Sequence, residues 1–272
     1  MTNQSGKTAW ITGASSGIGE ALAKAWLDRG GNCILSGRNV AALQAVAEAA
    51  ADRCLVLPFD TTDYAQIRAL VEQAIASRGG IDVLVNNAGI SQRSLAQDTD
   101  FSVYQQIVEI DLLAPIALTQ AVLPHLLARG SGQLVMISSV AGKVGVPLRT
   151  AYCAAKHGLI GYADSLRGEV AGQGLRVLTV APGSVRTNVS RNALAGDGAV
   201  RGVSDKAIDN GIGPDVVART IWDAVDAGKR EIVIAEGMEA QLPVLRAADP
   251  EKLFDMVEAM MAAGYAQKMK AE

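Results

Sequence analysis

Short apolar runs recur along the chain and alternate with longer amphipathic stretches. The runs are rich in Val, Ile and Leu and lie at 7–12, 32–36, 54–59, 82–87, 133–138, 175–182 and 231–235. Between most of them, apolar residues repeat at helical spacing, as in GEALAKAWLDRG and DYAQIRALVEQAIASRGG. Alternating strands and helices predict right-handed βαβ units, and therefore one parallel sheet with helices on both faces.

Two regions depart from this alternation. Residues 183–213 are rich in Gly, Asn and Ser and are too long for an ordinary connection. We interpret the part from about 188 to 213 as a lid over a site, with a disordered insertion as the alternative. After the last run, residues 236–272 predict a helical extension whose apolar face packs against the body or a partner subunit. That face consists of Leu253, Met256, Val257, Met260 and Met261.

The composition fits one domain rather than two. Of the 272 residues, 49% are hydrophobic, 4% aromatic and 19% charged, so aliphatic side chains supply the core that buried parallel strands need. No linker rich in Pro, Gly and Ser divides the chain, and we expect residues 1–272 to form a single domain. The formal net charge of −3, without a basic stripe, argues against a nucleic-acid partner.

Metal and membrane chemistry have little support in the sequence. Cys33, Cys54 and Cys153 are far apart with no CxxC pair, and two histidines alone do not build a usual metal site. We therefore expect buried, reduced thiols and no metal. The N-terminus lacks an apolar run after a charged start, and no segment reaches the roughly 20 apolar residues that span a bilayer. These features predict a soluble cytoplasmic protein without a membrane span.

A glycine-rich loop joins the first apolar run to the first helical segment, in TGASSGIGEALAKAW. Glycine lets the backbone turn tightly and approach a ligand, while the start of a helix offers free N–H groups to a pyrophosphate. The spacing G-x-x-x-G-x-G differs from the usual G-x-G-x-x-G, and a plain glycine-rich turn is the alternative. We predict a nucleotide-phosphate site formed by Gly13, Ser15, Ser16, Gly17, Ile18 and Gly19.

The end of the second apolar run bears on the type of nucleotide. NAD-dependent proteins place an acidic residue there, about 20 residues after the glycine loop, to bind the ribose 2′-hydroxyl. This chain has LSGRN instead, and the Arg38 guanidinium is suited to pair with a 2′-phosphate. The sequence favours NADP(H) over NAD(H), with a surface arginine paired to an acidic residue as the alternative.

A tyrosine and a lysine four residues apart, Tyr152 and Lys156, occur among small residues in AYCAAKHGL. This spacing places both side chains on one face of a helix, so the ammonium lies near the phenol. The pair is therefore either catalytic or a solvated surface pair.

Four motifs occur in the order of a known family. They are TGASSGIG at 12–19, NNAG at 86–89, a serine before YxxxK at 152–156, and PGSVRT at 182–187. With them, the chain from about Lys7 to Ile234 resembles the short-chain dehydrogenase/reductase family. The resemblance implies a doubly wound Rossmann-type α/β domain with seven parallel strands in the order 3-2-1-4-5-6-7. The stretch ISSVAGKVGVPLRTAYCAAKHGL, with RTNVSRNAL downstream, is similar to the branch that includes 11β-hydroxysteroid dehydrogenase-like reductases.

The resemblance assigns catalytic roles to three residues. Tyr152 resembles the general acid/base, which gives a proton to a carbonyl oxygen or removes it from an alcohol. A free phenol titrates near pH 10, and the positive charge of Lys156, which in the family also binds the nicotinamide ribose, favours the phenolate. Ser139, thirteen positions before Tyr152, resembles the serine that hydrogen-bonds the reacting oxygen, and we prefer it to Ser138. We thus interpret the Tyr–Lys pair as catalytic.

The resemblance also implies coenzyme contacts. Asn87, Ala88 and Gly89 resemble the segment that closes the adenosine side, although NNAG alone is also typical of a turn after a strand. Asp60 resembles the adenine contact. Four further residues resemble the stretch that borders the nicotinamide and the base of the lid: Pro182, Gly183, Val185 and Thr187.

One residue departs from the family pattern. The family has an asparagine in the helix IVEIDLLAPIALTQ, where it holds a water that relays protons to the lysine, and this chain has Asp111. No asparagine lies between Asn87 and Asn188 that a shifted alignment could use instead. An ionised carboxylate only accepts hydrogen bonds, and its charge offsets part of the effect of Lys156. We expect activity with an altered pH profile.

The sequence therefore predicts an oxidoreductase that transfers a hydride between NADP(H) and a small-molecule carbonyl or secondary alcohol. A non-catalytic NADP(H)-binding sensor or scaffold with an impaired site is the alternative. A nucleotide-sugar epimerase also uses Tyr and Lys, but the chain after Pro182 is too short for a sugar-nucleotide domain.

The substrate and the assembly are less well defined by the sequence. A steroid-like ketone follows only from the branch resemblance. The residues expected to face the substrate, besides the lid, are Ser91, Val144, Leu148 and Arg149. The resemblance also implies a homodimer or homotetramer whose subunits pair through the helices around 104–129 and 150–172.

Overall fold

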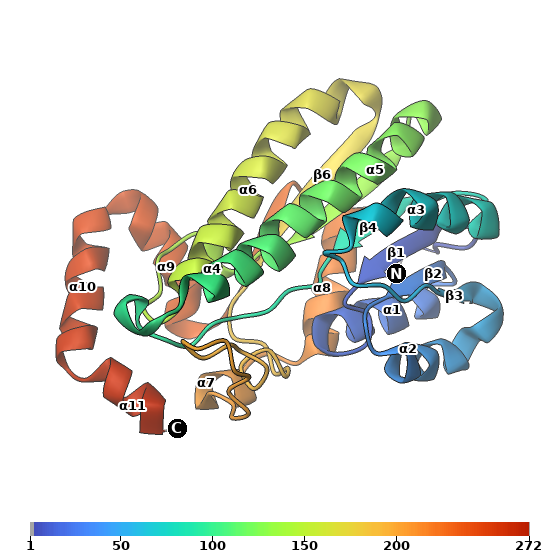
Figure 1. Ribbon diagram of the computed structural model, residues 1–272. Helices are drawn as coiled ribbons and strands as arrows, with labels where there is room; N and C mark the ends of the chain where they lie inside the picture. Colours follow the sequence, from blue (N-terminus) through green and yellow to red (C-terminus); the bar gives the residue numbers. More distant parts are fainter. Residues whose placement is uncertain (1–2, 272) are drawn as a thin grey trace.

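Seven parallel strands form one sheet in the computed structural model, which describes residues 3–271 (Figure 1). The strands are β1 (Thr8–Thr12), β2 (Asn32–Ser36), β3 (Cys54–Val56), β4 (Val83–Asn86), β5 (Gly132–Ile137), β6 (Leu175–Pro182) and β7 (Glu231–Ile234). Their order across the sheet is β3-β2-β1-β4-β5-β6-β7, so the direction of winding reverses between β1 and β4. The predicted doubly wound sheet and its strand order are confirmed.

The strands follow the predicted apolar runs, with one clear difference at β3. We predicted a strand over 54–59, whereas β3 ends at Val56. Pro58 has no N–H to give to the neighbouring strand, so regular pairing stops before it. The backbone still runs beside β2, because the N–H of Phe59 donates to the carbonyl of Gly37.

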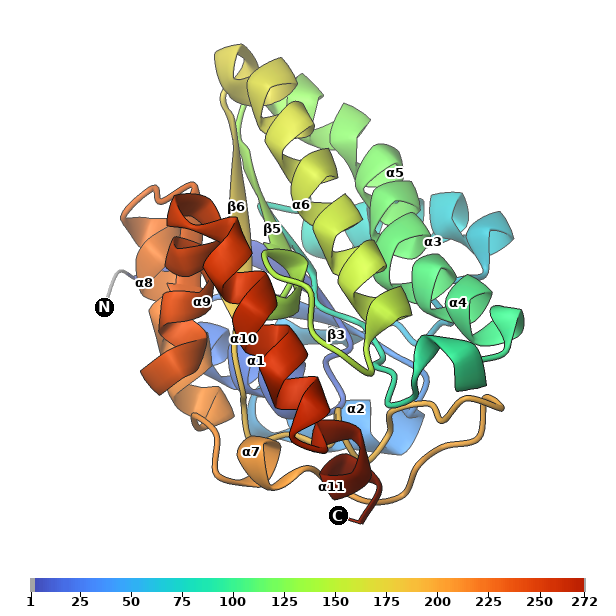
Figure 2. The ribbon, with the colours of Figure 1, turned by 90° about the vertical axis from the view of Figure 1, so that its left-hand side faces the viewer.

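Helices cover both faces of the sheet (Figure 2). One face is covered by α1 (Gly17–Asp28), α2 (Val40–Ala47) and α8 (Pro214–Asp226). The other is covered by α3 (Tyr64–Arg78), α5 (Ala114–Arg129) and α6 (Thr150–Val170). In Figure 2, α8 lies on one side of β5 and β6, and α5 and α6 lie on the other. The inner strands β1, β2, β4, β5 and β6 are thus largely buried on both faces, as their continuous apolar sequences require, whereas the edge strands β3 and β7 are more exposed.

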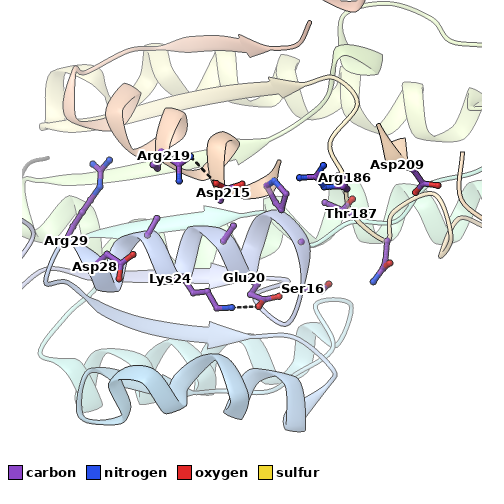
Figure 3. A pocket seen from close by; sticks show the side chains of 15 residues that line it. Ser16, Glu20, Lys24, Asp28, Arg29, Arg186, Thr187, Asp209, Asp215 and Arg219 are labelled. Atoms are coloured by element: carbon purple, nitrogen blue, oxygen red, sulfur yellow. Dashed lines mark hydrogen bonds and ion pairs between the residues drawn. The ribbon is translucent and has the colours of Figure 1, made fainter. Parts of the chain in front are cut away.

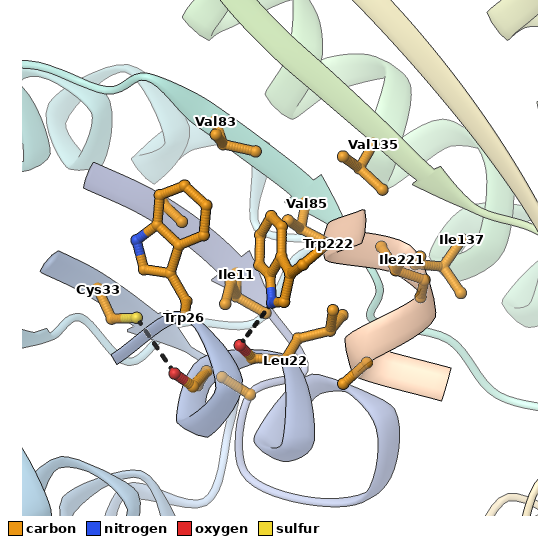
Figure 4. Packing of buried hydrophobic residues seen from close by; sticks show 14 of the residues in the cluster. Ile11, Leu22, Trp26, Cys33, Val83, Val85, Val135, Ile137, Ile221 and Trp222 are labelled. Carbon is orange, nitrogen blue, oxygen red and sulfur yellow. Dashed lines mark hydrogen bonds between the residues drawn. The ribbon is translucent and has the colours of Figure 1, made fainter. Parts of the chain in front are cut away.

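Two tryptophans pack in the layer between the sheet and helices α1 and α8 (Figure 4). The rings of Trp26 in α1 and Trp222 in α8 have centroids 4.4 Å apart, and each side chain is at most 1% exposed. The Trp222 indole N–H donates to the carbonyl of Leu22, and that of Trp26 donates to the carbonyl of Asn32. Both buried donors are therefore satisfied. This packing holds α1 against the sheet, and with it the glycine-rich loop that precedes the helix.

A long helix runs from Phe101 to Arg129 on the opposite face. It consists of α4 (Phe101–Val108), a π-helical turn η3 (Glu109–Leu113) and α5. By length and composition this helix is apolar enough to cross a membrane, so our expectation that no segment reaches that limit is wrong. Part of its apolar surface serves the fold, because 39% of the most apolar window is buried and α5 packs on the sheet beside α3, whereas Phe101 and Leu113 are exposed. A helix of a protein core passes the same test.

The segment after β6 follows a defined path without regular strands. Isolated bridges join Leu194 to Gln92 and to Val200, and a short helix, α7 (Lys206–Asp209), follows. The predicted irregular connection is therefore folded onto the body through the loop after β4.

Within the described residues, the C-terminal extension consists of three helices: α9 (Gly237–Ala248), α10 (Pro250–Ala262) and α11 (Tyr265–Ala271). In Figure 1 they form the red end of the chain, and α11 lies near α7 in both ribbon views. Leu253 and Val257 pack against the segment that follows β5, whereas Met256 and Met260 are exposed. The predicted apolar face is thus only partly used within this chain.

Candidate functional site

A cleft of about 810 Å³ opens at the carboxyl ends of the strands, around the point between β1 and β4 where the winding reverses. Open α/β sheets bind their ligands at this position. Of the residues predicted for the site, those that line the cleft are Gly13, Ser15, Ser16, Gly17, Ile18, Arg38, Asp60, Asn87, Ala88, Gly89, Asp111, Ser139, Tyr152, Lys156, Pro182, Gly183, Val185 and Thr187. Gly19 is the exception.

The glycine loop leaves no room for side chains. A Cβ on Gly13, whose φ is +64°, would lie 2.9 Å from Asn87 Nδ2, and one on Gly19 would lie 2.2 Å from the Gly13 carbonyl oxygen. Gly19 therefore lets α1 pack closely on the loop rather than lining the cleft. The N-cap side chain of α1, Ser16, makes no hydrogen bond to the first turn, so backbone N–H groups there are free to bind an anion. This geometry fits a pyrophosphate.

Asn87 ties the glycine loop to the segment after β4. Its Nδ2 donates to the carbonyl oxygens of Thr12 at 2.8 Å and Gly13 at 3.4 Å. The backbone N–H groups of Asn87 and Ala88 donate to Thr12 Oγ1 at 3.0 and 3.1 Å. The NNAG motif thus holds two walls of the cleft at a fixed spacing, which is more than a turn alone would do.

Arg38 and Asp60 lie together at the end of the cleft formed by β2 and β3. The Asp60 carboxylate accepts from the N–H and the hydroxyl of Thr62 at 3.0 and 2.8 Å. The Thr62 N–H, followed by its hydroxyl and Arg38, holds the pKa of Asp60 below its ordinary value, although burial raises it. This end of the cleft therefore offers one cation and one ionised acceptor at neutral pH.

Tyr152 and Lys156 lie one turn apart on α6, and Asp111 faces them from η3. The Lys156 Nζ lies 5.7 Å from the centroid of the Tyr152 ring and 3.1 Å from Asp111 Oδ2. Asp111 Oδ1 accepts from the N–H of Ile90 at 2.8 Å, and Lys156 also donates to the carbonyl of Ile137 at 3.1 Å. Both charged side chains are at most 5% exposed. The aspartate that replaces the family's asparagine is therefore a direct ion-pair partner of Lys156.

Burial and pairing act together on these charges. Burial raises the pKa of Asp111, and the Lys156 ammonium limits that rise. Burial alone would lower the pKa of Lys156, but Asp111 and Tyr152 raise it above its ordinary value, so the lysine is charged at neutral pH. Gly89 makes room for the pair, because a Cβ there would lie 3.0 Å from Asp111 Oδ2 and 3.3 Å from Lys156 Nζ.

The two serines after β5 have different partners. Ser138 is buried, and its Oγ donates to the carbonyl of Lys156 at 3.0 Å, so it holds α6 in place. Ser139 is partly exposed; its Oγ accepts from the N–H of Ala141 at 3.1 Å and donates to the carbonyl of Pro182 at 3.3 Å. The longer bond of Ser139 leaves its hydroxyl proton the easier of the two to redirect toward a ligand.

The residues that line the part of the cleft where we expect the substrate differ from our prediction. Ser91, Val144, Leu148 and Arg149 do not line it, because this part of the chain is turned toward the lid segment and the C-terminal helices. Two residues that the sequence did not single out, Gln106 and Ile110, line it, together with Asn192, Leu194 and Val200 from the segment predicted as a lid. The first two lie on the helix of Asp111, four residues apart, and this helical spacing was the available signal.

A buried carboxylate in the predicted lid joins three arginines. Asp205 Oδ2 accepts from Arg93 Nε at 2.6 Å and lies 3.4 Å from Arg149 Nη2, while Arg201 pairs with Oδ1. Burial raises the pKa of Asp205, but Arg93 and Arg201 bring it down to about 2. Burial, followed by Arg149, lowers the pKa of Arg93 to about 10. The cluster fastens the lid segment to the loop after β4 and to the start of α6.

A second cavity, of about 630 Å³, lies between α1 and α8 (Figure 3). It shares part of the glycine loop and Thr187 with the larger cleft. Its walls have charges of both signs, and Glu20 pairs with Lys24 as Asp215 does with Arg219. Because these paired charges balance, the cavity has no excess of positive or negative charge that would attract a charged ligand. We therefore place the functional site in the larger cleft.

The fold and the cleft together define a Rossmann-type nucleotide-binding protein with a tyrosine–lysine pair at its centre. The model of the short chain dehydrogenase family matches residues 7–197, which is more than half of the chain. The protein therefore belongs to the short-chain dehydrogenase/reductase family of oxidoreductases, as its motifs predict.

Relatives and solved structures agree with this assignment. The chain is 41% identical over 239 residues to dehydrogenase/reductase SDR family member 7B of Danio rerio, covering 84% of this chain and 77% of that one. It is 41% identical over 196 residues to human dehydrogenase/reductase SDR family member 7, covering 69% and 58%. A short-chain dehydrogenase from Streptomyces avermitilis has a similar structure, with a TM-score of 0.81, 29% identity and coverage of 96% and 99%. The finer resemblance to the 11β-hydroxysteroid dehydrogenase-like branch stays a prediction.

Proposed function

We propose that this protein is an NADP(H)-dependent dehydrogenase/reductase that interconverts a carbonyl compound and a secondary alcohol. The observation that supports this most directly is the convergence of the glycine loop, Ser139, Tyr152 and Lys156 in one cleft. A metagenomic short-chain oxidoreductase solved with NADP is 30% identical to this chain, covers 86% of it and has a TM-score of 0.71, which supports a nicotinamide coenzyme for this chain.

The preference for NADP(H) rests on Arg38. Structures of similar fold were solved with NAD in one case and with NADP or 5-hydroxy-NADP in three, so the fold accepts both coenzymes and does not by itself assign one to this chain. The chain has Gly37 and Arg38 where an NAD-binding acidic residue is expected, and Arg38 lines the cleft. Its guanidinium would bind a 2′-phosphate through charge-assisted hydrogen bonds.

In this proposal the chain supplies position, charge and a proton. When bound, the nicotinamide supplies the hydride for reduction or accepts it in oxidation. Tyr152 Oη gives a proton to the carbonyl oxygen, or takes one from the alcohol, while Ser139 Oγ hydrogen-bonds and orients the same oxygen. Lys156 stabilises the phenolate that exists after the proton has left.

Asp111 adjusts this chemistry without preventing it. Its ion pair with Lys156 keeps the ammonium charged and in place, but its own negative charge disfavours a phenolate nearby. We therefore propose that oxidation requires a higher pH than it would with a neutral residue at this position. The alternative, a sensor or scaffold with an impaired site, would bind the coenzyme without turnover.

We also propose that the segment from about 188 to 213 covers the substrate, because Asn192, Leu194 and Val200 line the cleft and Asp205 fastens the segment to the body. A homodimer or homotetramer formed through the helix from 101 to 129 and through α6 is consistent with the exposed apolar side chains of the former, such as Phe101, which is 74% exposed.

The experiment that tests the proposed function is a panel of ketones and aldehydes with NADPH, followed by coenzyme absorbance. Tyr152→Phe is expected to bind NADPH as the wild type does but to lose about 10²–10⁴-fold in turnover, the usual contribution of a positioned acid. Tyr265→Phe, which changes a tyrosine outside the cleft, is the matched control and should react normally. Coenzyme binding without turnover of any carbonyl by the wild type would favour the sensor alternative.

A further inference from the structure

Some residues of the PGSVRT loop line the cleft and others do not. Gly183, Val185 and Thr187 line the cleft, whereas Ser184 and Arg186 between them do not. A group that binds Ser184 on the side away from the cleft therefore fixes the position of its neighbours, which line the cleft.

Glu239, in the first turn of α9, holds Ser184 with both carboxylate oxygens. Glu239 Oε2 accepts from the Ser184 N–H at 2.6 Å, and Oε1 accepts from the Ser184 hydroxyl at 2.7 Å. Both side chains are half-buried. A glutamate three residues after an N-cap commonly bonds back to its own helix. Here the carboxylate instead serves a loop 55 residues away in the sequence.

Gly183 leaves room for the contact between Glu239 and Ser184. A Cβ at Gly183 would lie 2.3 Å from Glu239 Oε2 and 2.9 Å from Ala235 Cβ. The Gly183 N–H donates to the carbonyl of Ile234, the last residue of β7, at 2.9 Å. The absence of a side chain at 183 thus lets the end of β7 and the start of α9 close on the loop.

The contact comes from the part of the chain that lies beyond the family model, which ends at residue 197. The same extension packs Leu253 against Val140 and Val144, shortly after Ser139, and the carbonyl of Met269 accepts from Arg201 in the predicted lid at 2.9 Å. The extension therefore contacts three segments next to the cleft, and Glu239 makes a bidentate contact with the loop expected to border the nicotinamide.

We propose that Glu239 is a positioning residue of the coenzyme site: its carboxylate fixes Ser184 and thereby the nicotinamide side of the cleft. The inference rests on the proposed function, since it concerns the same coenzyme. It predicts an effect on coenzyme binding and not on the proton transfer by Tyr152.

The test is a fluorescence titration with NADPH of the full chain as wild type, Glu239→Ala, Glu239→Gln and Glu236→Ala. Charge-assisted hydrogen bonds are the strong ones, so Glu239→Ala should raise the Kd by about tenfold, which is about 1.4 kcal/mol. In Glu239→Gln, the amide oxygen can accept from the Ser184 N–H and the amide N–H can donate to Ser184 Oγ, so binding should be largely rescued. Glu236 is exposed and its side chain does not cap α9, so its removal is the matched control.

Turnover with the best carbonyl from the panel separates positioning from chemistry. The KM for NADPH should rise in Glu239→Ala while kcat at saturating NADPH changes by less than about twofold, because the reacting groups are untouched. If Glu239→Ala does not fold, Ser184→Ala removes one of the two bonds and should raise the Kd by a smaller factor.

Three results would overturn the inference. Wild-type affinity in Glu239→Ala would show that the contact has no role in coenzyme binding. A loss of affinity in the alanine variant that glutamine does not rescue would assign the effect to general destabilisation. Failure of the wild type to bind either NADPH or NADH would refute the proposed function itself, and this inference with it.

Discussion

Replacing Asp111 by asparagine removes one buried charge while it preserves the shape of the side chain. Asp111 Oδ2 lies 3.1 Å from Lys156 Nζ, and Oδ1 accepts from the Ile90 N–H at 2.8 Å. An amide oxygen can keep the bond to Ile90, and Lys156 keeps its bond to the carbonyl of Ile137. We therefore expect Asp111→Asn to fold, whereas Asp111→Ala, which leaves the buried Lys156 without its ion-pair partner and the Ile90 N–H without its acceptor, should lose about 3–5 kcal/mol of stability.

The effect of Asp111→Asn on the reaction can be estimated from the geometry. The distances of 3.1 Å and 5.7 Å share the Lys156 nitrogen, so the carboxylate oxygen lies within about 9 Å of the Tyr152 ring centroid. Two like charges about 9 Å apart repel by about 2 kcal/mol at an effective dielectric constant near 20. Since 1.36 kcal/mol corresponds to about one pH unit, the pH at which alcohol oxidation becomes fast should fall by about 1.4 units in the variant.

The assay is kcat/KM for NADP⁺-dependent oxidation of a secondary alcohol, measured against pH. Asp100→Asn is the control, because Asp100 is an exposed acidic residue at the start of the same long helix and caps it with no side-chain hydrogen bond. It should leave the profile unchanged. An Asp111→Asn profile that coincides with that of the wild type, or moves to higher pH, would refute the electrostatic reasoning.

Three further predictions concern the parts that hold the site. Asp205→Asn should lower the free energy of unfolding in urea by about 3–5 kcal/mol at pH 7. Because the pKa of Asp205 is about 2 when folded, its stabilisation is present above the ordinary carboxyl range near 4 and is lost as the pH falls toward 2, so the difference from wild type should shrink over that interval. Trp222→Ala should cost about 3–5 kcal/mol, and a cost below about 1 kcal/mol would show that the tryptophan layer repacks. Gly89→Ala should lower turnover by about tenfold through displacement of Lys156 while the melting temperature stays near that of the wild type; unchanged turnover would show that the ion pair tolerates the methyl group.

The fold was predictable because its signals are local and repeated. Each strand is an apolar run bounded by turn residues, and the glycine loop lies directly between β1 and α1, so the order of elements leaves few topologies. The position of β3 was right and its length was wrong, because Pro58 interrupts the pairing without interrupting the apolar pattern.

The site was only partly predictable, because several of its contacts join residues that have no common local pattern. The motifs predicted the residues that line the cleft, but not that Asp111 would touch Lys156 directly. Glu239 reaches Ser184 across 55 residues, and Arg93 reaches Asp205 across 112. A single acidic residue in a helix or an irregular segment has no periodicity that reveals its partner, and only the packing of distant elements brings the two together.

The central claim is tested most directly by titrating the purified wild type, Arg38→Ala and Arg68→Ala with NADPH and with NADH. Arg68 is exposed on α3 and lies outside the cleft, so it controls for the loss of a surface cation. We predict that the wild type binds NADPH more tightly than NADH, that Arg38→Ala loses this advantage, and that Arg68→Ala keeps it. Equal affinity of the wild type for both coenzymes, or an advantage that survives in Arg38→Ala, would contradict the account.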